Sequence, residues 1–374
     1  MRQKLLVFHP VIAPYRIDFF NALCETFHAE VYLYQKNLVT QTFDMNALYK
    51  QLCFKPRYLL QKWNLGLFSV PKGIFSALRE NKPDIVMVTE YNMITLIVLL
   101  YKYLFFRRFK VVSIVDDSYD MVTNDNDFSK WHKYARMLVA RLLDNLINVE
   151  PRVAEWYQAH YQKGIYFPII CEDRKARDRL KRILPISENL VTSYQLEGKR
   201  VLLFVGRLVE LKNLFFVLDA FKALAQKECV FVIVGDGPQR KDLEEYTQAI
   251  PNVIFTGRLE GEELYAWYNI AQVFTLPSTR EPFGAVTNEA LLGGCYVLVS
   301  CLAGSNCLIR EGVNGNLINP YNQTDYVKKL ELAFSKSAPC KIPLKLRKNA
   351  MPESFQSYFC RLTNELQSGV STTN

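Results

Sequence analysis

Two cationic side chains and two carboxylates in the second half of the sequence are of the types that a bound diphosphate and ribose require. Arg207 lies just after an apolar segment, Lys212 follows five residues later, and seven residues separate Glu281 from Glu289. Arginine and lysine can neutralise a diphosphate, and a carboxylate can accept hydrogen bonds from both hydroxyls of a ribose. Taken singly, Arg207 and Lys212 also fit a surface ion pair with Glu210. The combination predicts a nucleotide-sugar site.

Glycines and a predicted helix start lie next to these side chains. Gly206 comes directly after the same apolar segment, and Phe283 and Gly284 form part of the turn between the two glutamates. A helix is expected from about 285 to 292, so its first backbone N–H groups and its positive dipole end would also suit a diphosphate. We expect the nucleobase to be held near Arg258, through backbone contacts.

Short apolar segments alternate with helical patterns along most of the chain. The strands expected from them are 4–8, 30–34, 84–89, 110–115, 146–149, 201–205, 230–234, 253–256, 273–276 and 296–299. Strand starts about 20–30 residues apart, with helices between them, indicate βαβ units and parallel sheets. Because ligands bind outside the carboxyl ends of the strands in such sheets, the residues just after each strand are expected to form the site.

Length and charge pattern favour two domains. The chain has 374 residues, against about 150 for an average domain, and its 24 phenylalanines and 21 tyrosines exclude wholesale disorder. A highly charged stretch, 171–182, and an aperiodic stretch, 185–199, separate the two series of strands. The expected divisions are a domain over 1–170, a linker over 171–198, a domain over 199–350 and a terminal helical segment over 351–374.

The stretch from Val201 to about Pro320 resembles the C-terminal domain of retaining glycosyltransferases of family 4, which have the GT-B fold. The segments that carry the resemblance are LFVGRLVELKN at 203–213, VIVGDGP at 232–238, EPFGAVTNE at 281–289, and Asn314-Gly315 before Asn319-Pro320. The resemblance implies an α/β protein of two Rossmann-like, doubly wound parallel-sheet domains that face a central cleft. It also implies a C-terminal helix that crosses back to the N-terminal domain.

The resemblance also implies roles for the site residues. Arg207 and Lys212 would hold the donor diphosphate and Glu289 the ribose, while Glu281 and the backbone around Phe283-Gly284 would hold the transferred sugar. Such enzymes retain the anomeric configuration without an established protein nucleophile, and the donor's own phosphate oxygen takes the acceptor proton. They need no cofactor and no metal, because the Arg/Lys pair stabilises the departing diphosphate.

The first half departs from the family pattern. Ala13-Pro14-Tyr15-Arg16 resembles a subset of the family, but Asp116 to Asp120 stand where a histidine often follows a strand. Asp117 or Asp116 is expected to orient the acceptor hydroxyl, or else both cap the following segment. Glu90 and Arg16 are expected acceptor contacts at the same sheet edge. A metal-binding DxD site over 116–120 is a further interpretation, but nothing else supports the fold that uses one.

The first half is also basic and aromatic. The chain carries 46 basic and 37 acidic residues, a net charge of +9, and residues 1–180 hold 25 of the basic and 18 of the acidic ones. The apolar segment 93–106 is too short to span a membrane and runs into Arg107, Arg108 and Lys110. An aromatic and basic edge of this kind suits an anionic membrane surface, although a buried helix with a charged end explains the same residues.

Several other classes of protein are excluded. The sequence has no GxGxxG after the first strand, no GxxxxGK[ST], no GxSxG and no HExxH, and no nucleic-acid partner is expected. Its nine cysteines form no CxxC pair, and it begins directly with a strand-like segment. These features favour a reducing, cytoplasmic location, with peripheral contact at the inner face of the cell membrane.

The leading hypothesis is a glycosyltransferase that uses a UDP-sugar and a glycan or polyprenyl-diphosphate-linked glycan acceptor, as in bacterial capsule or O-antigen synthesis. One alternative is a GT-B epimerase, which would release UDP and a free product without an acceptor. Another is a non-catalytic subunit that binds a sugar nucleotide or a glycan.

Overall fold

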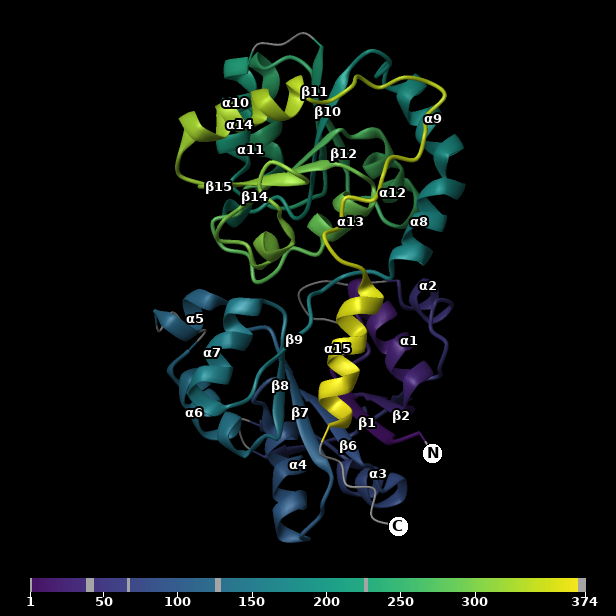
Figure 1. The fold of residues 1–374 in the computed structure, drawn as a ribbon, viewed down its shortest axis with the longest axis vertical. Coiled ribbons are helices and arrows are strands. Elements are labelled where there is room, and N and C mark those ends of the chain that lie inside the picture. The colour runs from purple at the N-terminus through teal and green to yellow at the C-terminus, as the bar shows by residue number, and fades with distance from the viewer. Residues whose placement is uncertain (1, 38–43, 66–67, 125–128, 225–227, 369–374) are drawn as a thin grey trace. The chain divides into compact units, whose positions relative to one another are not determined.

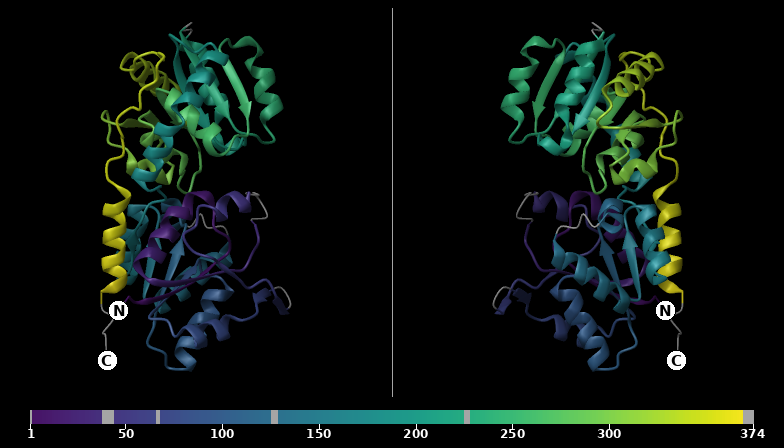
Figure 2. Two further views of the ribbon diagram at one scale, coloured as in Figure 1. Left: turned by 90° about the vertical axis from the view of Figure 1, so that its right-hand side faces the viewer. Right: turned by 90° about the vertical axis from the view of Figure 1, so that its left-hand side faces the viewer.

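The computed structural model describes residues 2–37, 44–65, 68–124, 129–224 and 228–368. The chain divides into two compact units, one of residues 1–169 and 356–374 and the other of residues 170–355. Each unit is a parallel sheet with helices on both faces (Figure 1; Figure 2). The expected α/β class with two parallel-sheet domains is therefore confirmed.

The first unit is built on a parallel sheet with the strand order β3-β2-β1-β6-β7-β8-β9 in its described part. Its strands are β1 (Lys4–His9), β2 (His28–Leu33), β3 (Arg57–Tyr58), β6 (Ile85–Thr89), β7 (Lys110–Val115), β8 (Asn145–Asn148) and β9 (Ile165–Tyr166). A short antiparallel pair, β4 (Lys62–Leu65) and β5 (Phe68–Pro71), lies outside this sheet. The five longer strands match the expected segments to within two residues.

Helices complete the first unit. They are α1 (Ile17–Thr26), α2 (Met45–Tyr49), α3 (Ile74–Asn81), α4 (Met93–Leu104), α5 (Tyr119–Thr123), α6 (Lys130–Leu142), α7 (Pro151–Tyr161) and the greater part of α15 (Phe355–Gln367), with a 3-10 turn at Pro14–Arg16. The side chain of Asn92 starts α4 by accepting hydrogen bonds from the N–H groups of Ile94 and Thr95, at 2.9 and 3.2 Å.

The last helix, α15, belongs to the first unit from residue 356 onward. Figure 1 shows it in yellow beside the strands of that unit. The ring of its Tyr358 lies edge-on to Tyr166 of β9, with 5.7 Å between centroids. At its C-terminal end the ammonium of Lys110 donates to the carbonyl of Leu366 at 3.2 Å and also to that of Ser368. A cation at this end of a helix satisfies carbonyls that have no partner within the helix.

The second unit has a parallel sheet with the order β12-β11-β10-β13-β14-β15 in its described part. Its strands are β10 (Arg200–Val205), β11 (Cys229–Val234), β12 (Val253–Gly257), β13 (Val273–Leu276), β14 (Tyr296–Ser300) and β15 (Gly315–Ile318). Its helices are α8 (Asp173–Arg182), α9 (Leu184–Ser193), α10 (Leu214–Leu224), α11 (Arg240–Tyr246), α12 (Gly261–Ile270), α13 (Val286–Leu292) and α14 (Gln323–Ser335), with 3-10 turns at Glu210–Lys212, Thr247–Ala249 and Gly304–Leu308.

The expected linker at 171–198 is instead an integral part of the second unit. Residues 173–182 and 184–193 form α8 and α9, and their inward side chains Leu180 and Val191 are fully buried. The sequence analysis did not predict that this segment packs into the domain, because α8 carries charges on most of its surface and buries only a narrow apolar stripe. A helix needs only that stripe to pack on its neighbours.

Strand order places the functional residues. In each sheet the order reverses beside the first strand, between β1 and β6 in one unit and between β10 and β13 in the other. Loops that follow two such strands leave in opposite directions and open a crevice at their carboxyl ends, where ligands of doubly wound sheets bind.

Candidate functional site

The loop after β10, beside the reversal point of the second sheet, is tightly packed around Gly206. A side chain at Gly235 would place its Cβ 1.8 Å from the Gly206 carbonyl oxygen, and one at Gly237 would lie 2.4 Å from that of Leu208. The loops after β10 and β11 therefore touch through their backbones. This contact needs glycine, and it brings the backbone of the expected diphosphate site close to the sheet.

Lys212 and Glu281 meet directly at this point. The ammonium of Lys212, at the end of the 3-10 turn after β10, donates a hydrogen bond to Oε2 of Glu281, which follows β13. Their side chains are only 18% and 14% exposed. The structure thus brings together two of the predicted site residues, in the partly buried setting where an ion pair is stronger than at the surface.

The loop of Glu281 is held against the segment after β14. The Gly304 N–H donates to the Glu281 carbonyl at 3.1 Å, and the Ser305 N–H donates to the Phe283 carbonyl at 2.7 Å. Gly284 has a left-handed backbone, φ 92°, where other residues are strained. The Phe283 side chain is buried, so only its backbone is available to a ligand.

Glu289 is held by two tyrosines that the sequence analysis did not identify. It lies in the first turn of α13, and its carboxylate accepts from the hydroxyls of Tyr268 at 2.8 Å and Tyr265 at 3.1 Å, both on α12. Burial raises the pKa of Glu289 above its usual value, and the two hydroxyls oppose that rise. Each carboxylate oxygen keeps a second lone pair that can accept from a ribose hydroxyl.

The two predicted arginines of this unit differ in their surroundings. The side chain of Arg207 is exposed and forms no hydrogen bond or ion pair with any residue that the structure describes. Arg258 is also exposed, but its guanidinium pairs with Glu260. Of the two, Arg207 has the side chain that is available to an anion.

In the first unit, Arg16 and Asp116 form an ion pair at the carboxyl edge of the sheet. The buried Arg16 guanidinium donates to Asp116 Oδ1 at 2.9 Å, across a separation of 100 residues. The Asp116 carboxylate is about half exposed. Neither Asp116 nor Asp117 caps the segment that follows, because the Ser118 hydroxyl caps α5 by accepting from the Met121 N–H at 3.4 Å.

Asp117 and Glu90 lie deeper, beside His132. Asp117 is 1% exposed, and its Oδ2 accepts from the hydroxyls of Tyr91, at 3.1 Å, and Tyr157. Glu90 follows β6 with a left-handed backbone, φ 58°, and its Oε1 accepts from the Asp116 N–H at 3.0 Å. Burial raises the pKa of both carboxylates.

His132 and the two tyrosines carried no signal in the sequence. His132 lies in the first turn of α6, where its N–H donates to the Ser129 hydroxyl at 3.1 Å. His132 is far in the chain from every predicted strand end, so there was no reason in the sequence to place it beside Glu90. Tyr91 and Tyr157 have the spacing of ordinary core aromatics.

Comparison with known proteins bears on the second unit. Residues 187–351 match the family model described as Glycosyl transferases group 1. A 130-residue segment is 35% identical to the uncharacterized glycosyltransferase MJ1607 of Methanocaldococcus jannaschii, covering 34% of this chain and 33% of that protein. A 123-residue segment is 37% identical to the GDP-mannose-dependent alpha-mannosyltransferase of Corynebacterium glutamicum, covering 33% of this chain and 28% of that protein. The match spans about a third of the length of these relatives.

The likeness in structure extends over both units. The crystal structure of Anabaena Alr3699/HepE in complex with UDP matches 98% of this chain and 100% of that chain, with a TM-score of 0.72 and 15% identity. The chain has the GT-B fold. At this identity the likeness shows the fold alone. The family match contains every predicted donor-side residue, from Gly206 to Glu289, whereas Arg16, Glu90, Asp116 and Asp117 lie outside it.

Proposed function

We propose that the protein is a retaining glycosyltransferase that moves a sugar from a UDP-sugar to a glycan acceptor carried on a polyprenyl diphosphate, in the synthesis of a surface polysaccharide. The observation that carries this proposal is the Lys212–Glu281 pair beside Gly206 and Arg207, at the strand-order reversal of the second sheet. The family match over residues 187–351 supports it, as do the names of the relatives.

The donor would be bound by side chains that are already positioned. The diphosphate binds to Arg207 and draws the Lys212 ammonium away from Glu281, whose carboxylate then accepts hydrogen bonds from the sugar hydroxyls. Glu289 accepts from the ribose hydroxyls while Tyr265 and Tyr268 keep it in place. Backbone groups near Arg258 contact the base.

In the transfer step the bond between the sugar's anomeric carbon and the diphosphate oxygen breaks, and the acceptor oxygen bonds to the same face of that carbon. The acceptor proton passes to the departing phosphate oxygen. Arg207 and Lys212 stabilise the negative charge that develops on the diphosphate, which is the role a metal ion has in other transferases. The reaction therefore needs no metal at this site.

A transfer assay tests the proposal. The purified protein is incubated with UDP-sugars and a polyprenyl-diphosphate-linked glycan, and the product and its anomeric configuration are determined. Transfer with retention is expected, falling by about 10²–10³-fold in Lys212→Met and unchanged in Lys222→Met, an exposed lysine of α10. Release of UDP and a free epimerised sugar without acceptor, or inversion at the anomeric carbon, would contradict it.

A lipid-linked acceptor calls for contact with the membrane surface, and the first unit has a suitable face. No helix in the described ranges combines the length and apolarity needed to cross a bilayer. The end of α4 and the outer side of α6 instead expose a group of apolar side chains: Leu100, Tyr103, Leu104, Phe105, Phe106, Tyr134, Leu138 and Leu142. The Tyr103 hydroxyl donates to the Leu142 carbonyl at 3.1 Å and joins the two helix ends.

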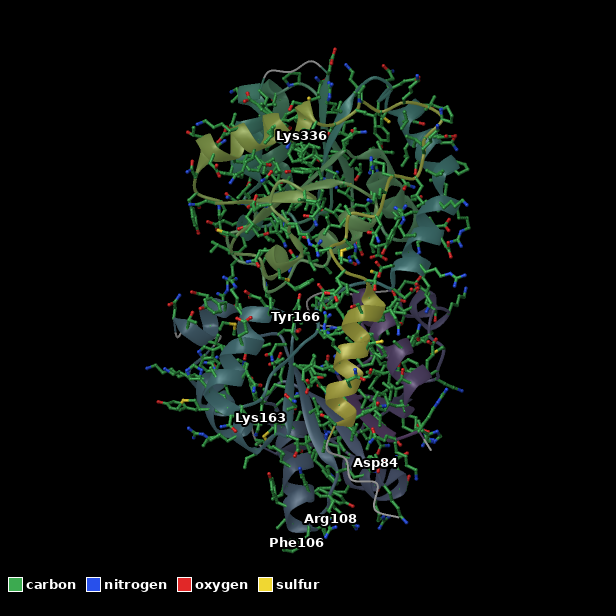
Figure 3. The ribbon with its side chains drawn as sticks, viewed as in Figure 1. Asp84, Phe106, Arg108, Lys163, Tyr166 and Lys336 are labelled. Carbon is green, nitrogen blue, oxygen red and sulfur yellow. The ribbon has the colours of Figure 1, made fainter. Side chains whose placement is uncertain are left out.

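Basic residues border this apolar face. Phe106 is 90% exposed, and Figure 3 shows it close to Arg108 at one end of the first unit. Arg107 and Arg108, which follow Phe106 in the chain, are exposed, as is Arg141 near the end of α6. The predicted contribution of Lys110 is wrong, since its ammonium binds the end of α15. Exposed aromatic and aliphatic side chains next to arginines suit the interface of an anionic bilayer.

Vesicle sedimentation tests the membrane contact. Binding is expected to vesicles with a third of anionic lipid and to be several-fold weaker on neutral vesicles. The double change Leu104→Ser and Phe106→Ser should remove most of it, and Leu332→Ser, an exposed leucine of α14, should not. Equal binding by all three proteins would contradict a docking face at α4 and α6.

A further inference from the structure

Glu90 and Asp117 of the first unit share an unusual arrangement of hydrogen bonds. In each carboxylate one oxygen accepts hydrogen bonds: Glu90 Oε1 from the Asp116 N–H at 3.0 Å, and Asp117 Oδ2 from the hydroxyls of Tyr91 and Tyr157. The other oxygens, Glu90 Oε2 and Asp117 Oδ1, are buried and accept no hydrogen bond from the described residues. A buried carboxylate oxygen without a donor is costly.

Both of these oxygens face one imidazole nitrogen. His132 Nε2 lies 3.9 Å from Glu90 Oε2 and 3.8 Å from Asp117 Oδ1, and the three atoms lie within 4.8 Å of one another. The residues come from three elements, since Glu90 follows β6, Asp117 follows β7 and His132 is on α6. These distances are too long for hydrogen bonds but leave room for an ion between the three atoms.

The charges at this edge also leave a cation to be supplied. Asp116 has its own partner in Arg16. Two buried carboxylates less than 5 Å apart repel each other, and a cation bound between them would offset that repulsion.

We propose that Glu90 Oε2, Asp117 Oδ1 and His132 Nε2 bind a divalent transition-metal ion such as Zn²⁺ or Mn²⁺. Two carboxylate oxygens and one imidazole nitrogen are a ligand set that these ions accept. Bond lengths of about 2.0–2.2 Å require the three atoms to approach one another by a few tenths of an ångström or more, so binding would draw both the Glu90 and the His132 side chains toward Asp117. Water or a ligand oxygen completes the coordination.

The surrounding hydrogen bonds support this assignment. Ligands of metal ions are commonly oriented by partners on their second polar atom. Here Tyr91 and Tyr157 hold Asp117 through the oxygen that would not bind the ion, and the Asp116 N–H holds Glu90 in the same way. Only Asp117 of the 116–120 segment takes part, so this is not a DxD site.

The site contains none of the proposed donor residues, which are all in the second unit, although Glu90 and Asp117 are also expected acceptor contacts. The metal can therefore be tested without any sugar nucleotide. The protein is stripped with EDTA, and Zn²⁺, Mn²⁺ or Mg²⁺ is titrated by calorimetry. Co²⁺ is added separately, so that its visible absorption bands report coordination by nitrogen and oxygen.

One equivalent of Zn²⁺ or Mn²⁺ per chain is expected, with Mg²⁺ binding at least tenfold more weakly. Asp117→Asn and His132→Gln should each weaken binding by more than tenfold and remove the Co²⁺ bands. Asp116→Asn, which removes a neighbouring charge but no ligand atom, should stay within about threefold of the native protein. Thermal melting of each stripped variant checks its folding, and Glu90→Gln replaces any variant that does not fold.

Two results would overturn the assignment. One is the absence of saturable Zn²⁺ or Mn²⁺ binding to the native protein. The other is binding that survives in Asp117→Asn and His132→Gln, or that is lost equally in Asp116→Asn, which would place the ion elsewhere. Nucleotide binding in EDTA remains a separate measurement of the second unit.

Discussion

The Lys212 ammonium donates a hydrogen bond to the Glu281 carboxylate, 69 positions later in the chain. The two residues that are assigned to opposite ends of the donor, the diphosphate and the sugar, therefore bind each other in the protein without donor. A bound diphosphate must compete with Glu281 for Lys212. When the diphosphate binds Lys212, both side chains become available to the donor at once.

This competition predicts that UDP and a UDP-sugar respond differently to Glu281→Gln. The neutral amide holds Lys212 less strongly than the carboxylate does. UDP has no sugar that could contact residue 281, so its affinity for the variant should equal that for the native protein or exceed it by up to about fivefold. Sugar transfer should fall by about 10²-fold or more. Calorimetry with UDP and a transfer assay on the same preparation check both. A large loss of UDP affinity would show instead that Glu281 supports the diphosphate site itself.

The tyrosines around Glu289 are predicted to act on donor binding rather than on the chemical step. Tyr268→Phe removes a hydroxyl 2.8 Å from Oε2, which leaves the carboxylate less firmly oriented and costs about 1 kcal/mol. The KM for the donor should rise about five- to tenfold with little change in kcat. Tyr246→Phe, which removes a hydroxyl bound to the exposed Asp219, is the control. A fall in kcat at unchanged KM would argue against a ribose-binding role for Glu289.

A buried histidine in the first unit predicts a pH dependence of stability. Burial, and secondarily Arg16, lower the pKa of His9 to about 3, and its Nδ1 is hydrogen-bonded to the Val11 carbonyl at 2.8 Å. Between that pKa and the ordinary value of about 6.5, the unfolded chain binds a proton at His9 and the folded protein does not. The free energy of unfolding contributed by this group therefore falls as the pH drops, by about 3 kcal/mol from pH 7 to pH 4.

His9→Asn keeps a donor for the Val11 carbonyl and removes the titration. Urea unfolding at a series of pH values should give a curve for this variant that is flatter than that of the native protein by about the same 3 kcal/mol. Parallel curves for the native protein and His9→Asn would mean that His9 titrates normally in the folded state.

The sequence predicted the parts of this protein that depend on local pattern. Strands with both faces buried, such as β10, are continuous apolar segments, and the residues after them must lie at the sheet edge. This reasoning put Lys212 and Glu281 at the edge of one sheet and Arg16 and Asp116 at the edge of the other, but it predicted neither ion pair. It failed where charge hid a packing stripe, as on α8, and it gave no sign of β15, whose short Gly315–Ile318 segment carries few apolar residues.

The features that sequence could not supply depend on tertiary contact. Tyr265 and Tyr268 have the sequence pattern of core aromatic residues. The local sequence does not show whether a tyrosine hydroxyl will contact a carboxylate or solvent. His132 reaches Glu90 only because α6 packs where it does. Lys110 comes soon after two arginines, so the sequence analysis assigned it to a basic edge. The Leu366 carbonyl that it binds lies 256 residues later in the chain.

Thermal unfolding with nucleotides, with and without EDTA, tests the donor site most directly. At one hundred times its dissociation constant a ligand stabilises the protein by about 2.7 kcal/mol, enough for a clear shift in Tm. A shift with UDP and UDP-sugars is expected, with each condition compared with its own ligand-free baseline. It should survive EDTA, disappear in Arg207→Ala and Glu289→Ala, and persist in Lys222→Ala. No shift with any nucleotide would contradict the proposed transferase.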